Sequence, residues 1–211
     1  FVNLFIGISL GANVLAARFY AAGREEEMSQ TVHTAITLAL ISGVVMAFVG
    51  VLFAKGALEL MGTPDDVISQ STLYMRIYFM GMPFFMLYDF GASILRSIGD
   101  TRRPMYALIV SGVVNVILNL LFVVIFRMGV AGAGLATVGA NAVSAAQIIY
   151  FLMHEELPIR LSFQSLMIDR DAVSKILRIG VPAGLQGMVF SLANVCIQSG
   201  INSFGAGGIA G

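Results

Sequence analysis

The chain has 211 residues, of which 58% are hydrophobic and only 11% are charged, and its mean hydropathy is +0.89. Soluble domains contain about 25% charged residues, so this composition excludes a soluble globular protein and predicts an all-α polytopic membrane protein. The formal net charge is zero, which gives no reason to expect a nucleic-acid partner.

Six apolar stretches are long enough, or nearly so, to cross the hydrocarbon region of a bilayer, which takes about 20 residues of helix. Gly81 and Pro83 lie inside the third stretch and predict a kink or break there, because proline removes a backbone hydrogen bond. In chain order the stretches cover roughly 1–21, 31–54, 67–96, 105–126, 131–153 and 176–204.

Basic residues predict the orientation of these stretches. Lys55 and Arg127 lie at one set of alternating ends, and Arg76, near the same side, is expected to reach the lipid headgroups. The opposite set holds Arg18, Arg24, Arg96, Arg102, Arg103, Arg160, Arg170, Lys175 and Arg178. The positive-inside rule places that richer set in the cytoplasm, so the first helix runs from outside to inside. Such a helix predicts another helix upstream, and we expect the chain to be part of a longer protein.

Asp89 is the first candidate functional residue, because an ionisable side chain in a membrane segment is costly and is a functional hypothesis by default. It lies roughly 10 Å inside the cytoplasmic end of its helix, at 1.5 Å per residue. Three interpretations stay open. Asp89 pairs with Arg96 two turns further on or with water near the interface, or it titrates or binds a cation in a hydrated cavity, or it stays neutral and only packs.

Polar side chains form stripes on the later stretches. Ser111, Asn115 and Asn119 recur at four-residue spacing and therefore share one face of a helix. Asn141 belongs to a similar stripe on the fifth stretch, and Gln186 lies above another on the sixth. Facing lipid, these stripes would be costly, so we expect them to converge on a shared interior. The alternative is that they only hold the helices together.

Sequence motifs for catalysis or metal binding are absent. His33 and His154 are isolated and share no metal-ligand spacing. The chain contains no G-x-S-x-G, no Walker loop and no H-E-x-x-H. We therefore expect a protein that is not an enzyme, with no metal site and no cofactor apart from a coupling ion.

Three segments with specific order and spacing, ILRSIGDTRRPMYA, VVNVILNLLFV and MGVAGAGLATV, resemble the multidrug and toxic compound extrusion (MATE) family. That resemblance implies twelve helices in two six-helix lobes. By this resemblance the chain is partial, corresponds to helices two to seven of the family, and has three parts. Residues 1–153 would be first-lobe helices two to six, 154–175 the cytoplasmic linker between lobes, and 176–211 the truncated first helix of the second lobe.

The resemblance also concerns the residues that couple transport to a proton or sodium gradient in the family. Asn115 and Asn119 match positions where the family often has Asn and then, four residues on, Asn or Asp. In relatives with Asp at the second position, that acid is linked to proton coupling, whereas here the residue is an amide. Some relatives carry a sodium-binding Glu in helix seven, but no acidic residue occurs between Arg178 and Gly211.

The function implied is secondary active efflux of drugs or organic cations across the inner or plasma membrane. H⁺ or Na⁺ antiport with alternating access would drive it. The predicted partners are these small molecules, the bilayer and the remainder of the same polypeptide. The alternatives are a flippase for lipid-linked saccharides on a related fold and a non-transporting membrane scaffold. The predicted pathway residues are Asp89, Asn115, Asn119, Asn141 and Gln186.

Overall fold

The computed structural model describes residues 2–60, 65–156 and 158–203, and this part of the chain is built from helices and their connections. A π-helical stretch, η1 (Leu120–Ile125), continues α5, and a 3₁₀ turn, η2 (Phe163–Ser165), precedes the last helix. The helices are α1 (Val2–Ala21), α2 (Glu25–Leu60), α3 (Asp65–Met80), α4 (Met82–Ser97), α5 (Arg102–Asn119), α6 (Gly129–Met153) and α7 (Arg170–Ser203).

Five spans, namely α1, α2, α5 with η1, α6 and α7, are long and apolar enough to cross a membrane. The helices α3 and α4 make a sixth if they are taken together, and they meet at an angle of 44°. The break falls at Gly81, and Pro83 lies in the first turn of α4, where a missing N–H costs little. The predicted all-α membrane fold and the predicted break in the third span are both confirmed.

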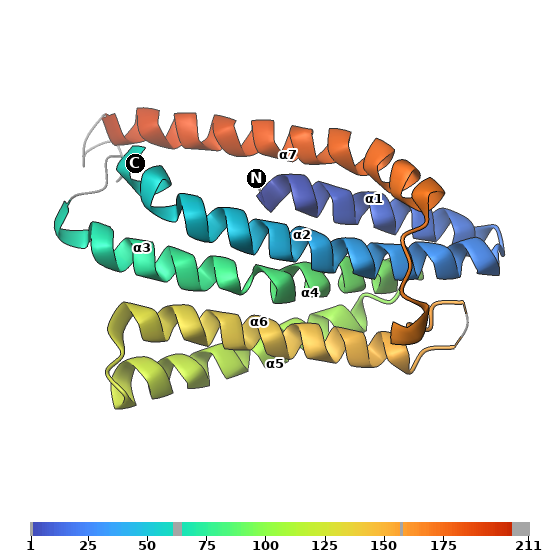
Figure 1. Ribbon diagram of the computed structural model, residues 1–211, viewed down its shortest axis with the longest axis horizontal. Coiled ribbons are helices and arrows are strands. Elements are labelled where there is room, and N and C mark those ends of the chain that lie inside the picture. The colour runs from blue at the N-terminus through green and yellow to red at the C-terminus, as the bar shows by residue number, and fades with distance from the viewer. Residues whose placement is uncertain (1, 61–64, 157, 204–211) are drawn as a thin grey trace.

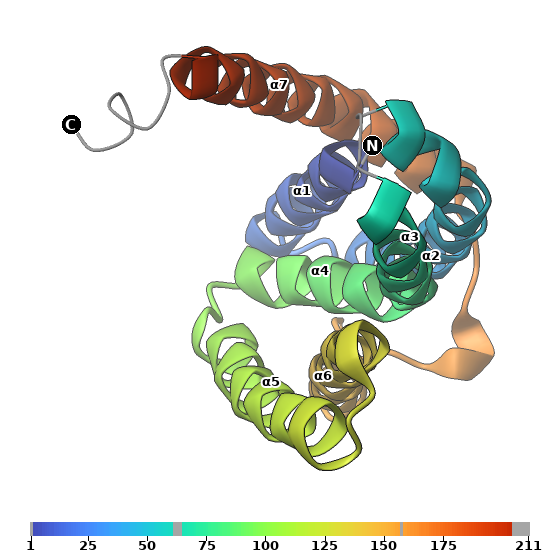
Figure 2. The same cartoon turned by 90° about the vertical axis from the view of Figure 1, so that its left-hand side faces the viewer.

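The helices run roughly side by side along the long axis of the molecule (Figure 1). Seen from the end, α5 and α6 lie on one side of the bundle and α7 on the other, with α4 between them (Figure 2). The helix α4 contacts α1, α2 and α6, and its residues Met86, Phe90 and Leu95 are fully buried. Leu108, Val116 and many other large apolar side chains face outward, as expected in lipid.

The most extensive contact between two helices joins α1 to α7. Glycines line it on both sides, with Gly7 and Gly11 on α1 and Gly180 and Gly184 on α7. A methyl group at Gly7 would overlap the backbone of Gly184, and one at Gly180 would overlap that of Ile8. Small residues therefore let these two backbones approach closely, as in many membrane helix pairs. We call this contact the α1–α7 seam.

The last helix begins before the apolar part of its sequence. Asp169 and Asp171 before an apolar run predict a short surface helix that leads into the span from 176, and α7 starts at Arg170 and continues into that span without interruption. The reason is local, because the Asp169 carboxylate accepts a hydrogen bond from the Ala172 N–H at 2.7 Å and so caps the first turn. Residues 204–211, which the predicted last segment includes, lie outside the described residues, and the division into lobes and linker stays a prediction.

Candidate functional site

Asp89 lies at an open cavity of about 490 Å³ between α1, α4 and α7. Its neighbours there include Gln186 of α7, so two of the predicted pathway residues come together although 97 positions separate them in the chain (186 − 89). The other polar groups lining this cavity are Asn3, Ser9, Ser93, Arg96 and Ser191. Apolar side chains complete the walls, among them Ile6, Leu10 and Phe190. We call it the Asp89 cavity.

Ser9 of α1 is the side chain that holds the Asp89 carboxylate. Its Oγ lies 2.5 Å from Asp89 Oδ2 and 2.9 Å from the carbonyl oxygen of Ile6, and Ser93 Oγ donates to it at 3.4 Å. A hydroxyl has a single hydrogen. When Asp89 is ionised, Ser9 donates to the carboxylate; when Asp89 carries a proton, Asp89 donates to Ser9 and Ser9 donates to Ile6. The contact between Ser9 and Asp89 is therefore kept in either charge state, whereas the bond from Ser9 to Ile6 forms only when Asp89 is protonated.

Arg96 does not pair with Asp89, which was one of the open interpretations of the sequence. The Arg96 Nε donates instead to the Ala92 carbonyl oxygen at 3.1 Å, and Arg96 lines the Asp89 cavity. These two residues are the charged groups in the cavity wall, as far as the described residues extend. The cavity thus offers a negative and a positive group at different positions, together with hydroxyl and amide groups.

Asn3 crosses the α1–α7 seam at the same cavity. Its Nδ2 lies 2.5 Å from Ser191 Oγ and 3.4 Å from the Gly187 carbonyl oxygen. Further along α1, Asn13 Nδ2 donates to the Ser93 carbonyl oxygen at 2.7 Å. The cavity is therefore bounded by polar contacts from α1 to both α4 and α7.

The three predicted asparagines lie apart from this cavity, on α5 and α6, and none of them lines it. Asn119 Nδ2 donates to Asn115, to its carbonyl oxygen at 3.0 Å and to its Oδ1 at 3.1 Å, so these amides pair within α5. Asn141 is half-buried on α6. The link between the two helices is made by Ser111, whose Oγ donates to the Ala140 carbonyl oxygen at 2.8 Å.

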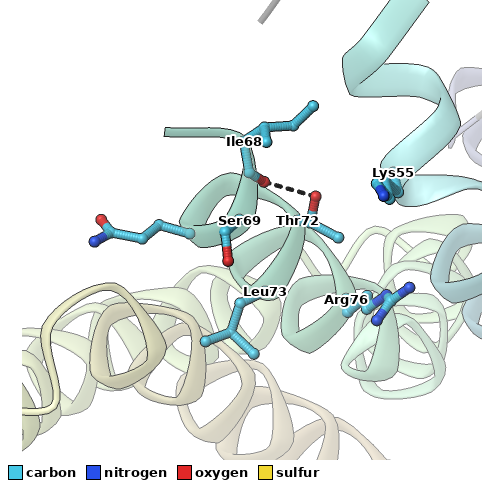
Figure 3. Close-up of a pocket in the computed structure, with 7 residues that line it drawn as sticks. Lys55, Ile68, Ser69, Thr72, Leu73 and Arg76 are labelled. Carbon is cyan, nitrogen blue, oxygen red and sulfur yellow. Dashed lines mark hydrogen bonds between the residues drawn. The ribbon is translucent and has the colours of Figure 1, made fainter. Parts of the chain in front are cut away.

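A second open cavity, of about 470 Å³, lies between the end of α2 and α3, and it contains none of the predicted pathway residues. Lys55 and Arg76 line the same side of it (Figure 3). Thr72 donates to the Ile68 carbonyl oxygen at 2.7 Å, and Lys55 forms an exposed ion pair with Glu59 at 3.7 Å. Because this cavity contains none of the predicted pathway residues and, as far as the structure describes it, no acidic residue in its wall, the Asp89 cavity is the candidate site.

Sequence reasoning missed Asn3, Ser9 and Ser93. The signal that could have found them is the polar spacing within the first apolar stretch, where Asn3, Ser9 and Asn13 interrupt an otherwise small and apolar run. Each forms a hydrogen bond to another helix. A lone serine in a membrane helix is common, so only its contact with a carboxylate on another helix distinguishes Ser9.

The family model described as MatE matches residues 1–121, which is more than half of the chain and includes Ser9, Asp89, Asn115 and Asn119. The chain belongs to the MatE family. The resemblance seen in the sequence is therefore confirmed, and membership also accounts for the polytopic helical architecture.

Named relatives agree with this assignment. The chain is 33% identical over 216 residues to a "Probable multidrug resistance protein YoeA" of Bacillus subtilis, which covers 99% of this chain and 47% of that protein. It is 27% identical over 221 residues to an "FAD transporter" of Shewanella oneidensis, covering 97% of this chain and 48% of the relative. The chain spans about half the length of the curated relatives it matches. The first relative is named for multidrug resistance and the second for FAD transport.

Solved structures show the same fold. A crystal structure of MATE in the bent conformation superposes with a TM-score of 0.90 at 25% identity, over 99% of this chain and 47% of that one. An inward-facing multidrug resistance MATE transporter of the MOP superfamily superposes with a TM-score of 0.83, also at 25% identity, over 91% of this chain and 44% of that one. The helices α1 to α7 thus adopt the arrangement of a multi-pass MATE membrane protein.

Proposed function

We propose that this chain belongs to a secondary active exporter of drugs or other organic cations in a cell membrane, the inner or plasma membrane. Exchange for H⁺ or Na⁺ would drive export, and two lobes would alternate in exposing the pathway to either side. The names of the multidrug relatives support the substrate class. The observation that carries the proposal is the position of Asp89, a carboxylate at a cavity between three helices, where membrane proteins seldom keep an acidic group without a function.

In this proposal the Asp89 cavity binds cations. The carboxylate attracts the positive group of a drug or a coupling ion, and the apolar side chains beside it accept the hydrophobic body of the drug. Gln186 adds an amide that can orient a bound compound. Ser9 keeps its contact with Asp89 in both charge states, so the residue can exchange a proton or another cation for substrate without losing its position.

The amides of Asn115, Asn119 and Asn141 form a second part of the proposed pathway. They lie on α5 and α6, on the side of the bundle away from α7, so substrate would meet them at another stage than it meets Asp89. We expect them to bind through neutral hydrogen bonds, which suits compounds of varied charge and gives a modest affinity per contact.

Asp89→Asn in the complete protein tests this function. The substitution removes the charge with almost no change in shape, so we expect loss of resistance to cationic drugs and of cationic dye efflux, with normal amounts of protein in the membrane. Asp171→Asn is the matched control, because Asp171 is an exposed carboxylate at the start of α7 that pairs with Lys175. Wild-type efflux in Asp89→Asn would rule the assignment out.

The coupling ion is a separate question with its own measurement. Membrane vesicles loaded with a fluorescent cationic dye are given either a pH gradient or a sodium gradient. Efflux that responds to one gradient alone identifies the ion, and efflux that responds to neither contradicts antiport.

A second candidate function is export of an anionic compound such as a flavin dinucleotide. The relative named an FAD transporter and the position of Arg96 in the wall of the Asp89 cavity favour it. Arg96→Gln distinguishes the two functions. It should abolish efflux of an anionic dye if the second function holds, and should leave cationic efflux in place if the first does.

A further inference from the structure

The segment between α6 and α7 is held against α2 by hydrogen bonds that the proposed transport function does not use. Figure 2 shows this segment passing beside α2 on its way to α7. The Ser162 backbone N–H donates to His33 Nε2 at 3.1 Å, and the Asp169 backbone N–H donates to Thr34 Oγ1 at 3.2 Å. Both acceptors are buried, with His33 5% and Thr34 0% exposed. Water therefore competes poorly for either contact.

The hydrogen-bond partners of His33 match one protonation state of its ring. Nδ1 lies 2.7 Å from the carbonyl oxygen of Ser29, which can only accept a hydrogen bond, so Nδ1 carries a hydrogen. Nε2 faces the Ser162 N–H, which can only donate, so Nε2 carries none. Both contacts are satisfied together only by the neutral imidazole with its hydrogen on Nδ1.

A second proton would go to Nε2 and would point at the Ser162 N–H. Two donors would then face each other across this contact, and the Ser162 amide would lose its acceptor. An N–H that is buried without a partner is costly, so the contact would open and the amide would turn to water. Histidine ordinarily changes charge between about pH 5 and pH 8.

We propose that His33 is a pH-sensitive latch for the segment between α6 and α7. The neutral imidazole holds Ser162 on α2, and the protonated imidazole releases it. His33 lines a cavity of about 350 Å³ together with two charged groups, Glu26 from α2 and Arg160 from the segment itself. The effects of these two charges on a positive imidazole oppose each other. The carboxylate of Asp169 is directed to the Ala172 N–H at the start of α7.

The latch changes how firmly α7 is tied to the other helices. The segment leads directly into α7. Release at Ser162 leaves the start of α7 held by the α1–α7 seam, by Asp169 at Thr34, and by the bond from Thr37 Oγ1 to the Met167 carbonyl oxygen at 3.5 Å. Acidification of the compartment that this end of α2 faces would therefore loosen one of the connections between α7 and α2. This inference rests on hydrogen bonds alone and does not depend on what the protein transports.

Hydrogen–deuterium exchange on the complete protein in nanodiscs tests the latch. Exchange of peptides covering 158–169 is measured at about pH 7.5 and about pH 5.5, and each rate is divided by the chemical rate of an unstructured peptide at that pH. We expect protection of the Ser162 amide to fall about tenfold or more at the lower pH. Equal protection at the two pH values would overturn the proposal.

Two variants show whether the response comes from His33. His33→Gln keeps a neutral acceptor that does not titrate, so its exchange at Ser162 should not respond to pH, whether the contact is retained or lost at both values. A pH response that survives in this variant would overturn the assignment to His33. Thr34→Val removes the neighbouring acceptor and should lower protection at Asp169 while leaving the pH response of Ser162 unchanged.

Discussion

The hydrogen bond between Ser9 and Asp89 should stabilise the protein by an amount that depends on the charge of the carboxylate. A hydrogen bond to a charged group contributes about 1.5–3 kcal/mol, and one between neutral groups about 0.5–1.5 kcal/mol. Ser9 is only 2% exposed, so water does not replace the contact easily. Ser9 is also the one side-chain partner of Asp89 within the described residues. Its removal therefore eliminates the whole hydrogen-bond contribution.

The perturbation is a double-mutant cycle with Ser9→Ala, Asp89→Ala and the double variant, in the complete protein. The free energy of unfolding is measured for each in mixed micelles, and the cycle isolates the interaction of the two side chains. We expect a coupling energy of about 1.5–3 kcal/mol where Asp89 is ionised, falling to about 0.5–1.5 kcal/mol where it is protonated.

Two results would refute this reasoning. A coupling energy near zero at every pH would show that Ser9 does not hold the carboxylate. A coupling energy that stays constant across the whole accessible pH range would show that Asp89 does not change its charge, and proton exchange at this residue would then be wrong. Ser9→Thr is the control, because it keeps a hydroxyl group and should preserve most of the coupling.

Two further substitutions test the seam and the asparagine pair. Gly7→Ala should destabilise the protein by about 1–3 kcal/mol, because the added methyl overlaps the Gly184 backbone. Gly187→Ala is its control, since its methyl would meet only Asn3 Cβ at 3.8 Å and should leave the unfolding midpoint unchanged or slightly higher. Asn119→Ala removes both hydrogen bonds to Asn115 and should reduce drug efflux without reducing membrane insertion, as measured by efflux rate and by the amount of protein in the membrane; unchanged drug resistance would remove Asn119 from the proposed pathway.

Much of the fold could be predicted because hydropathy and backbone chemistry act over short distances in the chain. The apolar stretches give the spans, and Gly81 with Pro83 gives the break between α3 and α4. The acidic residues before the last span predicted a helix that leads into it, and the capping bond of Asp169 begins α7 there.

The candidate site was harder to predict because it depends on which helices meet. The spacing of Asn115 and Asn119 shows that they share a face, but it does not show that they pair with each other and lie apart from the Asp89 cavity. His33 is isolated in the sequence, and its hydrogen bond to the Ser162 backbone crosses 129 positions of the chain. Contacts between residues so far apart in the chain cannot be predicted from composition or periodicity.

By itself, the sequence determined that this chain is a bundle of membrane helices with one broken span and with polar groups that lipid would not accept. Only the tertiary structure decided the partner of Asp89, which is Ser9, 80 residues away on α1, and not Arg96 on the same helix. The physical reason is that the free energy of transferring a segment into the bilayer depends on that segment's own residues. A hydrogen bond depends on two groups that packing has brought within about 3 Å.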